Sequence, residues 1–207
     1  MTMSKDYITV GLTGQTGAGK TAVSEVFLKK GFLCVNADLT ARKVQSANTP
    51  CFRDIVSCFG ENIVGDNGEI NRKKLASIVF SDKDKLKQLE KICYPYISFD
   101  ILKQFRTLSG KTNFILLDAP TLFESGTDCF CDVIVGVTAD EETRLKRIMK
   151  RDNISEENAL MRIRSQKSED FFREHCDFII QNNSDYDSLV NTVLETIEKI
   201  MSGVEKT

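Results

Sequence analysis

The chain has 207 residues, of which 41% are hydrophobic and 28% are charged. These proportions argue against fibrous and intrinsically disordered proteins, and the length suffices for one α/β domain with an insertion or lid, or for two small domains. The formal net charge of −2 gives no overall reason to expect nucleic acid or an anionic membrane as a partner, so any polyanionic ligand must be bound by local basic clusters.

The N-terminal stretch MTMSKDY lacks the apolar region of a signal peptide, and we expect a soluble, cytoplasmic protein. Seven cysteines without a C-x-x-C pair, beside one histidine, argue against a zinc site and against a disulfide framework. We therefore expect reduced thiols. Cys34 and Cys93 read as core thiols, whereas Cys129 and Cys131 fall in a predicted loop, where a reactive thiol stays an open alternative.

A glycine-rich segment follows the first predicted strand. Ile8, Val10 and Leu12 alternate as in a buried strand, and a helical pattern runs from Val23 to a stop signal at Gly31. The segment between them fits G-x-x-x-x-G-K-[ST], the P-loop pattern, whose backbone N–H groups wrap phosphate oxygens. Its members are Gly14, Gln15, Thr16, Gly17, Ala18, Gly19, Lys20 and Thr21.

This placement predicts a phosphate site at the beginning of a helix, because the helix N-terminus adds its positive dipole end. We expect Lys20 to reach the β- and γ-phosphates and the Thr21 hydroxyl to bind Mg²⁺. The alternative interpretation is a glycine-rich turn with a surface lysine.

A second strand is predicted at 32–35, and it ends at Asn36-Ala37-Asp38. A strand, a helix and another strand form a βαβ unit, in which the strands are parallel and the crossover is right-handed. Asp38 is therefore expected at the carboxyl edge of the sheet, where the P-loop lies and where ligands bind in open α/β folds. There it would accept or orient the proton of an attacking hydroxyl.

The pattern from 39 to about 110 is helical. Apolar residues at three- and four-residue spacing over 86–105 predict a long helix that Pro95 must kink or break. We interpret this stripe as core and the block as a helical insertion between the second and third strands. Before the long helix we expect short helices at 39–46, 50–59 and 72–80, a turn at 66–68 and a helix cap at Asn71.

The third strand is predicted at 114–117, apolar on both faces, and it delivers Asp118 at its end. An acidic residue at this place is the Walker B arrangement, in which the carboxylate binds Mg²⁺ directly or through water. The alternative is a carboxylate that caps the following turn.

A strongly basic segment follows the fourth strand, which is predicted at 133–137. Residues 144–167 hold eight Lys or Arg against three Asp or Glu, a net charge of +5 in a chain of −2. In a helix, Arg144, Arg147 and Arg151 share one face. An arginine-bearing flap over a polyphosphate fits these charges, and a solvated helix face is the other interpretation.

The C-terminal part is predicted to hold a strand at 178–180 and an amphipathic helix from Val190 to Ile200. His175 is interpreted as a boundary residue rather than a ligand. Taken together, a phosphate cradle, carboxylates for Mg²⁺ and for a hydroxyl, and an arginine-rich element are the equipment for phosphoryl transfer. The sequence contains no Asn-Lys-x-Asp stretch for guanine recognition, and it favours a small-molecule kinase that uses ATP and Mg²⁺.

A series of motifs extends this pattern over nearly the whole chain. They are Gly11-Leu12-Thr13-Gly14 before the P-loop, Asn36-Ala37-Asp38 with Ala41-Arg42, Gly68-x-Ile70-x-Arg72, Val79-Phe80, Leu89-Glu90-x-Ile92 with Pro95, Ala119-Pro120-x-Leu122-Phe123-Glu124, Arg147-x-x-x-Arg151-Asp152, Arg162-Ile163-x-x-Gln166 and Ile180-x-Asn182. In order and spacing, the series resembles dephospho-CoA kinase.

The resemblance implies transfer of the ATP γ-phosphate to the ribose 3′-hydroxyl of dephospho-CoA, the last step of coenzyme A synthesis. It also implies a P-loop NTPase-type three-layer αβα fold with a parallel central sheet, a helical substrate-binding insertion and a helical lid. The implied boundaries are 1–38, 111–140 and 176–207 for the nucleotide-binding core, 39–110 for the region that binds the CoA substrate and 141–175 for the lid.

Site residues follow from the positions that match the family motifs. The expected catalytic residues are Asp38, Lys20 and Arg147. ATP is expected to meet the P-loop residues 14–21 together with Arg147, Arg151 and Asn182. The acceptor is expected to meet Asp38, Arg42, Leu122, Phe123 and Glu124, and Mg²⁺ to meet Thr21 and Asp118. We expect dephospho-CoA as the partner, neither nucleic acid nor a membrane, and a monomer or small homo-oligomer.

Three features depart from the family pattern. Asn36 replaces the first Asp of the usual Asp-Ala-Asp, the usual Gly-Gly-Ile-Gly-Ser-Gly-Lys loop reads Gly-Gln-Thr-Gly-Ala-Gly-Lys, and Tyr94 replaces the usual His before Pro95. Asp38 keeps the proposed base, whereas Tyr94 leaves any acceptor-side hydrogen bond from that imidazole open.

Other functions fit parts of the sequence. A different P-loop kinase that acts on a nucleoside or nucleotide would share the loop and lid but not the 36–42 motif. A nucleotide-dependent regulatory module would turn over ATP without an acceptor. An RNA-binding role for 144–167 fits least, because no aromatic-rich stacking surface accompanies the charges.

Overall fold

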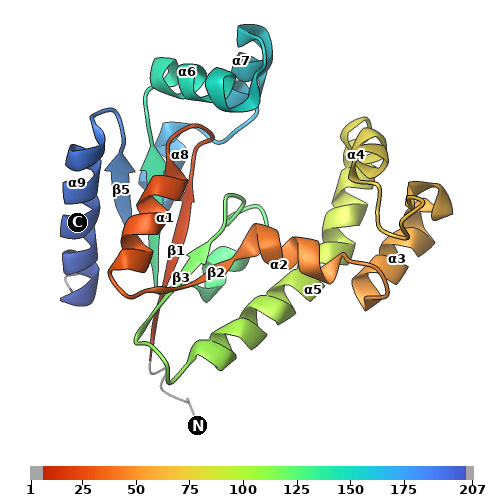
Figure 1. Cartoon of the computed structure of the whole chain (residues 1–207), viewed down its shortest axis with the longest axis horizontal. Coiled ribbons are helices and arrows are strands. Elements are labelled where there is room, and N and C mark those ends of the chain that lie inside the picture. The colour runs from red at the N-terminus through yellow and green to blue at the C-terminus, as the bar shows by residue number, and fades with distance from the viewer. Residues whose placement is uncertain (1–6, 204–207) are drawn as a thin grey trace. The chain divides into compact units, whose positions relative to one another are not determined.

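The computed structural model describes residues 7–203, and the chain divides into two compact units (Figure 1). The first unit draws on Met1–Cys34 and Leu108–Thr207, and the second is Val35–Thr107. We expected no signal peptide in the N-terminal stretch MTMSKDY. Residues 1–6 of this stretch lie outside the described residues. The second unit corresponds closely to the predicted insertion, while the implied domain boundaries, the lid at 141–175 included, stay predictions.

A five-stranded sheet forms the centre of the fold, in the order β2-β3-β1-β4-β5. The strands are β1 (Ile8–Gly14), β2 (Leu33–Asn36), β3 (Phe114–Asp118), β4 (Val133–Thr138) and β5 (Phe178–Gln181). All five predicted strands are confirmed within about two residues. β1 pairs in parallel with both β3 and β4, and β4 pairs in parallel with β5. Because β3 separates β1 from β2, the two strands of the predicted βαβ unit are not direct neighbours.

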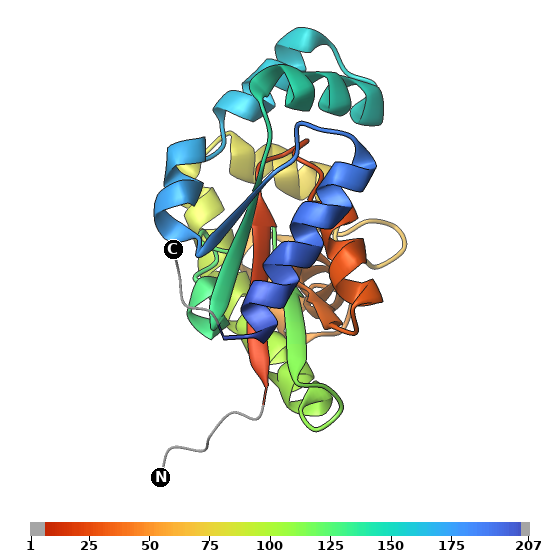
Figure 2. The ribbon, with the colours of Figure 1, turned by 90° about the vertical axis from the view of Figure 1, so that its left-hand side faces the viewer.

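Helices cover both faces of the sheet, which gives the three-layer α/β arrangement (Figure 2). In the first unit these are α1 (Lys20–Lys29), α6 (Glu141–Asp152), α7 (Glu156–Arg164), α8 (Glu169–His175) and α9 (Tyr186–Met201), with a 3₁₀ turn η2 (Thr127–Phe130). α1 and α9 pack on one face, and α8 contacts β4 and β5.

The alternation of side chains along β1 decides what each face carries. Val10 and Leu12 are completely buried in the core beneath α1 and α9. Gly11 points to the opposite face, where a Cβ atom would lie 2.6 Å from Cys131 Sγ and 3.0 Å from Leu122 Cδ2. The strand therefore needs a glycine where the segment after β3 crosses it.

α6 and α7 pack against each other as a helical pair (Figure 1). Ile148, Ala159 and Ile163 form a small apolar core between them. This pair corresponds to the basic segment, and its own core explains why the apolar residues recur at helical spacing there.

The second unit consists of helices. They are α2 (Ala37–Val44), α3 (Pro50–Phe59), the 3₁₀ turn η1 (Glu61–Ile63), α4 (Arg72–Phe80) and α5 (Lys83–Leu108). The predicted cap is confirmed, since the Asn71 side chain accepts a hydrogen bond from Lys74 N at 3.1 Å. α5 continues through Pro95, so the expected break does not occur. Cys93, Ile97 and Ile101 are buried on either side of Pro95, and this packing stabilises the helix despite the lost backbone hydrogen bond.

α2 begins directly after β2, with Asn36 as its N-cap. The Asn36 side-chain oxygen accepts a hydrogen bond from Leu39 N at 2.9 Å, and the Asn36 carbonyl accepts one from Thr40 Oγ1. Asp38 therefore lies in the first turn of a helix rather than in an open loop. Among the helices of residues 7–203, none is long and apolar enough to cross a membrane.

Replacing Asn36 by alanine should lower the free energy of unfolding by ~1 kcal/mol, because the N–H of Leu39 loses its capping acceptor. Asn36→Asp should keep wild-type stability, because a carboxylate oxygen can accept the same hydrogen bond. Urea unfolding of the three proteins measures the difference. An alanine variant as stable as the wild type would show that the cap contributes nothing.

Candidate functional site

The P-loop connects β1 to α1 through two glycines with positive φ. Gly17 has φ 77° and Gly19 has φ 96°, values that side-chain-bearing residues rarely adopt. Gly19 is also the N-cap of α1, and it offers no side-chain acceptor to the first N–H groups of that helix. These groups are consequently left for an anion, as the phosphate-site prediction requires.

Lys20 forms an ion pair with Asp118, Nζ to Oδ1. Their side chains are 16% and 11% exposed, so the pair is largely shielded from water. The pair brings together the Walker A lysine and the Walker B aspartate, from the first turn of α1 and the end of β3. Thr21 follows Lys20 with an exposed side chain.

Cys34 lies beside this ion pair. Burial raises the pKa of its thiol to about 11; the negative charge of Asp118 adds to the rise, and Lys20 opposes it. The thiol is hydrogen-bonded to the Asp118 backbone and to Ser24. Cys34 is therefore a protonated group that packs against the site, as its core assignment from sequence suggested.

Two side chains hold the outer side of the P-loop. Asn182 is buried and donates its Nδ2 to the Ala18 carbonyl at 2.7 Å. Arg147 directs Nη1 to the carbonyls of Gly17 and Ala18, each at 3.4 Å, and to that of Asn182 at 3.1 Å. With its carbonyls bonded to these donors, the loop is biased to present N–H groups to its inner side.

Arg144 is a third support of the loop, and the sequence interpretation missed it. It was expected to share one helix face with Arg147 and Arg151 in a flap over a polyphosphate, and the structure shows that it is only 5% exposed. Its Nε donates to the Thr16 carbonyl at 3.1 Å, while Thr16 N donates to Gln166 Oε1 at 2.7 Å. Burial lowers the pKa of Arg144, and the nearby Glu141 and Glu169 oppose this change. Its i,i+4 spacing from the buried Ile148 was a signal that could have revealed it.

Arg151 lies at the far end of α6, away from the P-loop contacts just described. Its Nε and Nη2 bind the carboxylate of Asp152 at 2.8 and 2.9 Å, and Arg162 binds the same carboxylate. These contacts hold the pKa of Asp152 below its ordinary value, with Arg151 as the main cause. A role for Arg151 in binding ATP stays a prediction.

Residues 122–124 have different surroundings. Leu122 is completely buried and lies over Gly11, whereas Glu124 is exposed. Phe123 belongs to an aromatic cluster, with ring centroids 5.2 Å from Phe171 and 5.8 Å from His175. His175 is the last residue of α8 and stacks on Phe171, so this boundary residue is also part of the cluster. The i,i+4 spacing of 171 and 175 was the available sequence signal. Contacts of 122–124 with an acceptor stay predictions.

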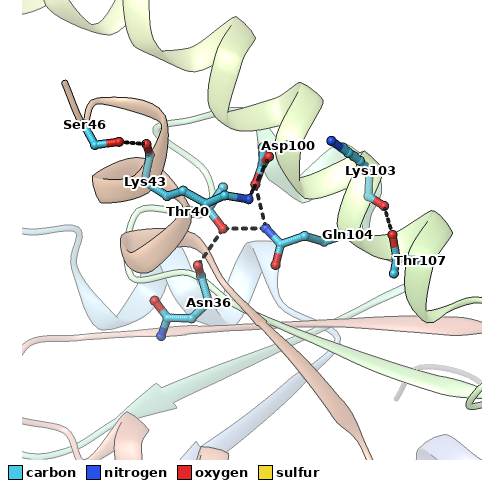
Figure 3. Close-up of polar contacts among 8 residues, drawn as sticks. All are labelled: Asn36, Thr40, Lys43, Ser46, Asp100, Lys103, Gln104 and Thr107. Atoms are coloured by element: carbon cyan, nitrogen blue, oxygen red, sulfur yellow. Dashed lines mark hydrogen bonds and ion pairs between the residues drawn. The ribbon is translucent and has the colours of Figure 1, made fainter. Parts of the chain in front are cut away.

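The second unit presents Asp38 and Arg42 on α2, four residues apart and therefore on one helix face. Both are exposed. A polar network on the other side of α2 fixes it to α5 (Figure 3). Gln104 Nε2 donates to Thr40 Oγ1 at 2.9 Å and to Asp100 Oδ2 at 3.0 Å, and Asp100 also pairs with Lys43.

In the first unit the structure brings together Lys20, Asp118, Arg147 and Asn182. Asp38 and Arg42 belong to the second unit, and their expected place at the sheet edge beside the P-loop stays a prediction. This arrangement gives one unit that can bind a polyphosphate and another that presents a carboxylate and an arginine from one helix face.

Comparison with known proteins decides the family. A family model described as dephospho-CoA kinase matches residues 8–188. The chain belongs to the dephospho-CoA kinase family. A dephospho-CoA kinase from Listeria monocytogenes is 38% identical, over 94% of this chain and 98% of its own length. One from Arabidopsis thaliana is 40% identical, over 95% of this chain and 86% of its own length.

Solved structures agree with this assignment. The dephospho-CoA kinase from Campylobacter jejuni superposes with a TM-score of 0.71 at 30% identity, over 94% of this chain and 98% of that one. A shikimate kinase from Acinetobacter baumannii superposes with a TM-score of 0.55 at 15% identity, over 97% and 96%, which shows a shared fold alone. The predicted P-loop kinase fold and family are thus confirmed, and the protein is an ATP-dependent phosphotransferase.

The structure also accounts for one departure from the family pattern. Position 36 supplies the side-chain oxygen that caps α2, and asparagine and aspartate cap helices about equally well. Asn36 therefore preserves the helix cap at this motif and leaves Asp38 as its one carboxylate.

Asn182→Ala should raise the KM for ATP about tenfold, because the P-loop loses a hydrogen bond between two uncharged groups and the Ala18 carbonyl loses the Asn182 donor. Asn191→Ala, on the exposed side of α9, is the matched control and should leave KM unchanged. Steady-state kinetics at varied ATP measures both. An unchanged KM in the Asn182 variant would remove this residue from the support of the loop.

Thiol reactivity should follow burial. Burial raises the pKa of Cys34 to about 11 and that of Cys176 to about 12, so both stay protonated at pH 8, whereas Cys58 and Cys129 are exposed. Iodoacetamide at pH 8 should label the exposed pair first, as read by peptide mass spectrometry.

The raised pKa of Cys34 should also make the stability of the fold depend on pH. Because the folded-state pKa of Cys34 is raised, its contribution to stability is complete below the ordinary thiol pKa of 9.0 and is lost as pH rises through about 11. The wild type should lose stability over this range, and Cys34→Ala should lose less. Equal losses in both proteins would contradict the assignment.

Proposed function

We propose that this kinase transfers the γ-phosphate of ATP to the ribose 3′-hydroxyl of dephospho-CoA and so forms coenzyme A. The observation that carries the proposal is the P-loop with its Lys20–Asp118 pair, supported from outside by Arg147 and Asn182. Such a loop would bind the donor polyphosphate, and the chain that carries it belongs to the dephospho-CoA kinase family.

On the donor side, the backbone N–H groups of residues 14–21 would surround the phosphates. Lys20 would leave Asp118 for the γ-phosphate, and Arg147 would add positive charge near the phosphoryl group that moves. Arg147 already reaches the loop carbonyls from α6, so its positive charge lies next to the loop that would bind the phosphates.

Thr21 and Asp118 fit Mg²⁺ because both supply hard oxygen donors. Within residues 7–203, no three His, Cys, Asp or Glu side chains are grouped so that they could hold a metal ion. Mg²⁺ in kinases commonly binds through one or two protein oxygens together with substrate phosphates, and this donor set suits that mode. When bound, the ion would neutralise charge on the β- and γ-phosphate oxygens.

On the acceptor side, Asp38 would accept a hydrogen bond from the 3′-hydroxyl and orient it for in-line attack. The first turn of α2 favours a carboxylate there, because the helix N-terminus carries partial positive charge. Arg42, on the same helix face, would bind a phosphate of the acceptor. Leu122, Phe123 and Glu124 would complete the acceptor site, with the buried Leu122 acting through its backbone.

We further propose a cytoplasmic enzyme that acts as a monomer or small homo-oligomer, without nucleic acid or membrane as a partner. The seven free cysteines support a reducing compartment, and the net charge of −2 supports small-molecule substrates.

The choice of acceptor tests this function. Dephospho-CoA should be phosphorylated with ATP, whereas adenosine, AMP and uridine should be poor acceptors. Transfer to one of the three with none to dephospho-CoA would assign the chain a different kinase activity. ATP turnover that ignores every acceptor would favour a regulatory module.

Asp38→Asn should lower kcat by about two orders of magnitude or more and leave ATP affinity unchanged, because the carboxylate acts on the acceptor hydroxyl in the transition state. Asp66→Asn, at an exposed turn of the same unit, is the control. Normal kcat in the Asp38 variant would remove Asp38 from its role.

Lys20→Ala should also lower turnover, through the lost γ-phosphate contact.

A further inference from the structure

Two cysteines of the second unit contact each other in its interior. Cys51 lies in the first turn of α3, and Cys93 lies in α5, 42 positions further along the chain. Cys51 is completely buried and Cys93 is 3% exposed. The Cys51 thiol donates a hydrogen bond to Cys93 Sγ, and the two sulfur atoms are 4.0 Å apart. They form a pair of free thiols that the proposed phosphoryl transfer does not use.

Cys93 also accepts a hydrogen bond from a second donor. Gln45 Nε2 donates to Cys93 Sγ at 3.4 Å. The Gln45 amide is held in this orientation, because its oxygen accepts a hydrogen bond from Arg72 Nη1 at 3.1 Å. Cys93 Sγ is thus the acceptor for two donors and lies near a guanidinium charge. Such surroundings stabilise a thiolate more than a thiol.

These contacts give the two thiols different roles. The hydrogen bond from Cys51 lowers the pKa of Cys93, and Gln45 and the charge of Arg72 act in the same direction, although burial opposes the change. The same hydrogen bond raises the pKa of Cys51, and burial adds to the rise. Cys93 therefore ionises first, while Cys51 keeps its proton.

The exposed thiols have the opposite hydrogen bonding. Cys58 donates its S–H to Gln88 Oε1 at 3.9 Å, and Cys129 donates its S–H to the Gly126 carbonyl at 3.0 Å. An S–H group that donates to oxygen is stabilised as a thiol. Exposure thus favours attack at Cys58 and Cys129, whereas hydrogen bonding favours Cys93. A bulky alkylating reagent and a small oxidant should therefore select different thiols.

We propose that Cys51 and Cys93 are a redox pair that a hydroperoxide oxidises to a disulfide between α3 and α5. In the first step the Cys93 thiolate attacks one peroxide oxygen. The S–O bond forms, the O–O bond breaks, and the second oxygen leaves as hydroxide and takes up a proton to form water. The Cys51 sulfur then attacks the sulfur of the Cys93 sulfenic acid. The S–S bond forms, and the hydroxyl group leaves with the Cys51 proton as a second water.

Access and geometry allow this sequence of steps. Cys51, although buried, belongs to the lining of a hollow of about 630 Å³ in the second unit, so a peroxide molecule, which is little larger than water, has a short path to the pair. The sulfur atoms must approach from 4.0 Å to about 2 Å, which rotation about the two Cα–Cβ bonds can achieve. In a reducing compartment such a bond is transient, as a response to oxidant requires.

Mass spectrometry of the full-length protein tests the proposal. Hydrogen peroxide is added in slight excess and then removed with catalase. The wild type should lose about 2 Da, and digestion with pepsin without reductant should give a peptide in which Cys51 is linked to Cys93. Dithiothreitol should restore the starting mass. Oxidation confined to Cys58 and Cys129, or the absence of the linked peptide, would overturn the proposal.

Two variants identify the sulfur that reacts first. In Cys51→Ser the serine hydroxyl can still donate to Cys93. Without a second thiol the sulfenic acid should persist on Cys93, where dimedone added during unfolding in urea labels it. In Cys93→Ser, Cys51 should carry about tenfold less label, because its thiol stays protonated. Equal labelling of Cys93 and Cys51 in the two variants would show that the proposed order of steps is wrong.

Gln45→Leu removes one donor to Cys93 at similar side-chain volume and should slow disulfide formation about fivefold. Gln88→Leu, which changes an exposed glutamine of α5, is the matched control and should leave the rate unchanged. Spectra of samples quenched at successive times measure both rates. An unchanged rate in the Gln45 variant would count against Cys93 as the stabilised thiolate. None of these measurements depends on phosphoryl transfer, so their outcome is separate from that of the acceptor test.

Discussion

The site depends on one constraint, which is that the P-loop must turn its backbone N–H groups inward. A loop with two positive-φ glycines has many conformations in an unfolded chain, so the folded protein must fix one of them. Arg144, Arg147 and Asn182 do this by binding the carbonyls of residues 16–18. Two of these supports come from α6 and one from the segment after β5. The loop geometry is thus maintained by parts of the chain more than a hundred residues away.

The basic segment 144–167 supports the P-loop as well as carrying charge for a ligand. Its surplus of positive charge suggested a flap that closes over a polyphosphate, but the first half of α6 already contacts the loop. Arg144 is buried with its guanidinium against the Thr16 carbonyl, where loss of the side chain would leave that acceptor without this donor. Arg151, Arg162 and Asp152 form a separate exposed ion-pair cluster on α6 and α7. The segment therefore contains structural arginines beside those available for a ligand, and the charge count alone cannot separate the two kinds.

The sequence predicted the strands, the P-loop and the Walker B position well, because each rests on local patterns: β-branched apolar runs, glycines and a terminal carboxylate. It missed the contacts of Arg144 and His175, because their i,i+4 spacings to Ile148 and Phe171 do not show which distant segment each side chain meets. It also predicted a kink or break at Pro95. No break occurs, because buried contacts at Cys93, Ile97 and Ile101 keep α5 continuous, and the kink stays a prediction. The place of Asp38 next to the P-loop depends on the relation between two units, and neither local pattern nor one unit alone fixes it.

The Lys20–Asp118 pair links the free protein to the proposed reaction. Both side chains are largely shielded, so removing either partner would leave a desolvated charge without compensation. Binding of ATP with Mg²⁺ would avoid this cost, since phosphate oxygens would replace the carboxylate at Lys20 while the cation would replace the ammonium at Asp118. Lys20 would exchange a negatively charged carboxylate for negatively charged phosphate oxygens, and Asp118 would exchange the ammonium group for another cation. Both exchanges would take place where the side chains are shielded from water. The pair therefore holds both side chains in position until the ligand arrives, and ligand charges would then take the place of each partner.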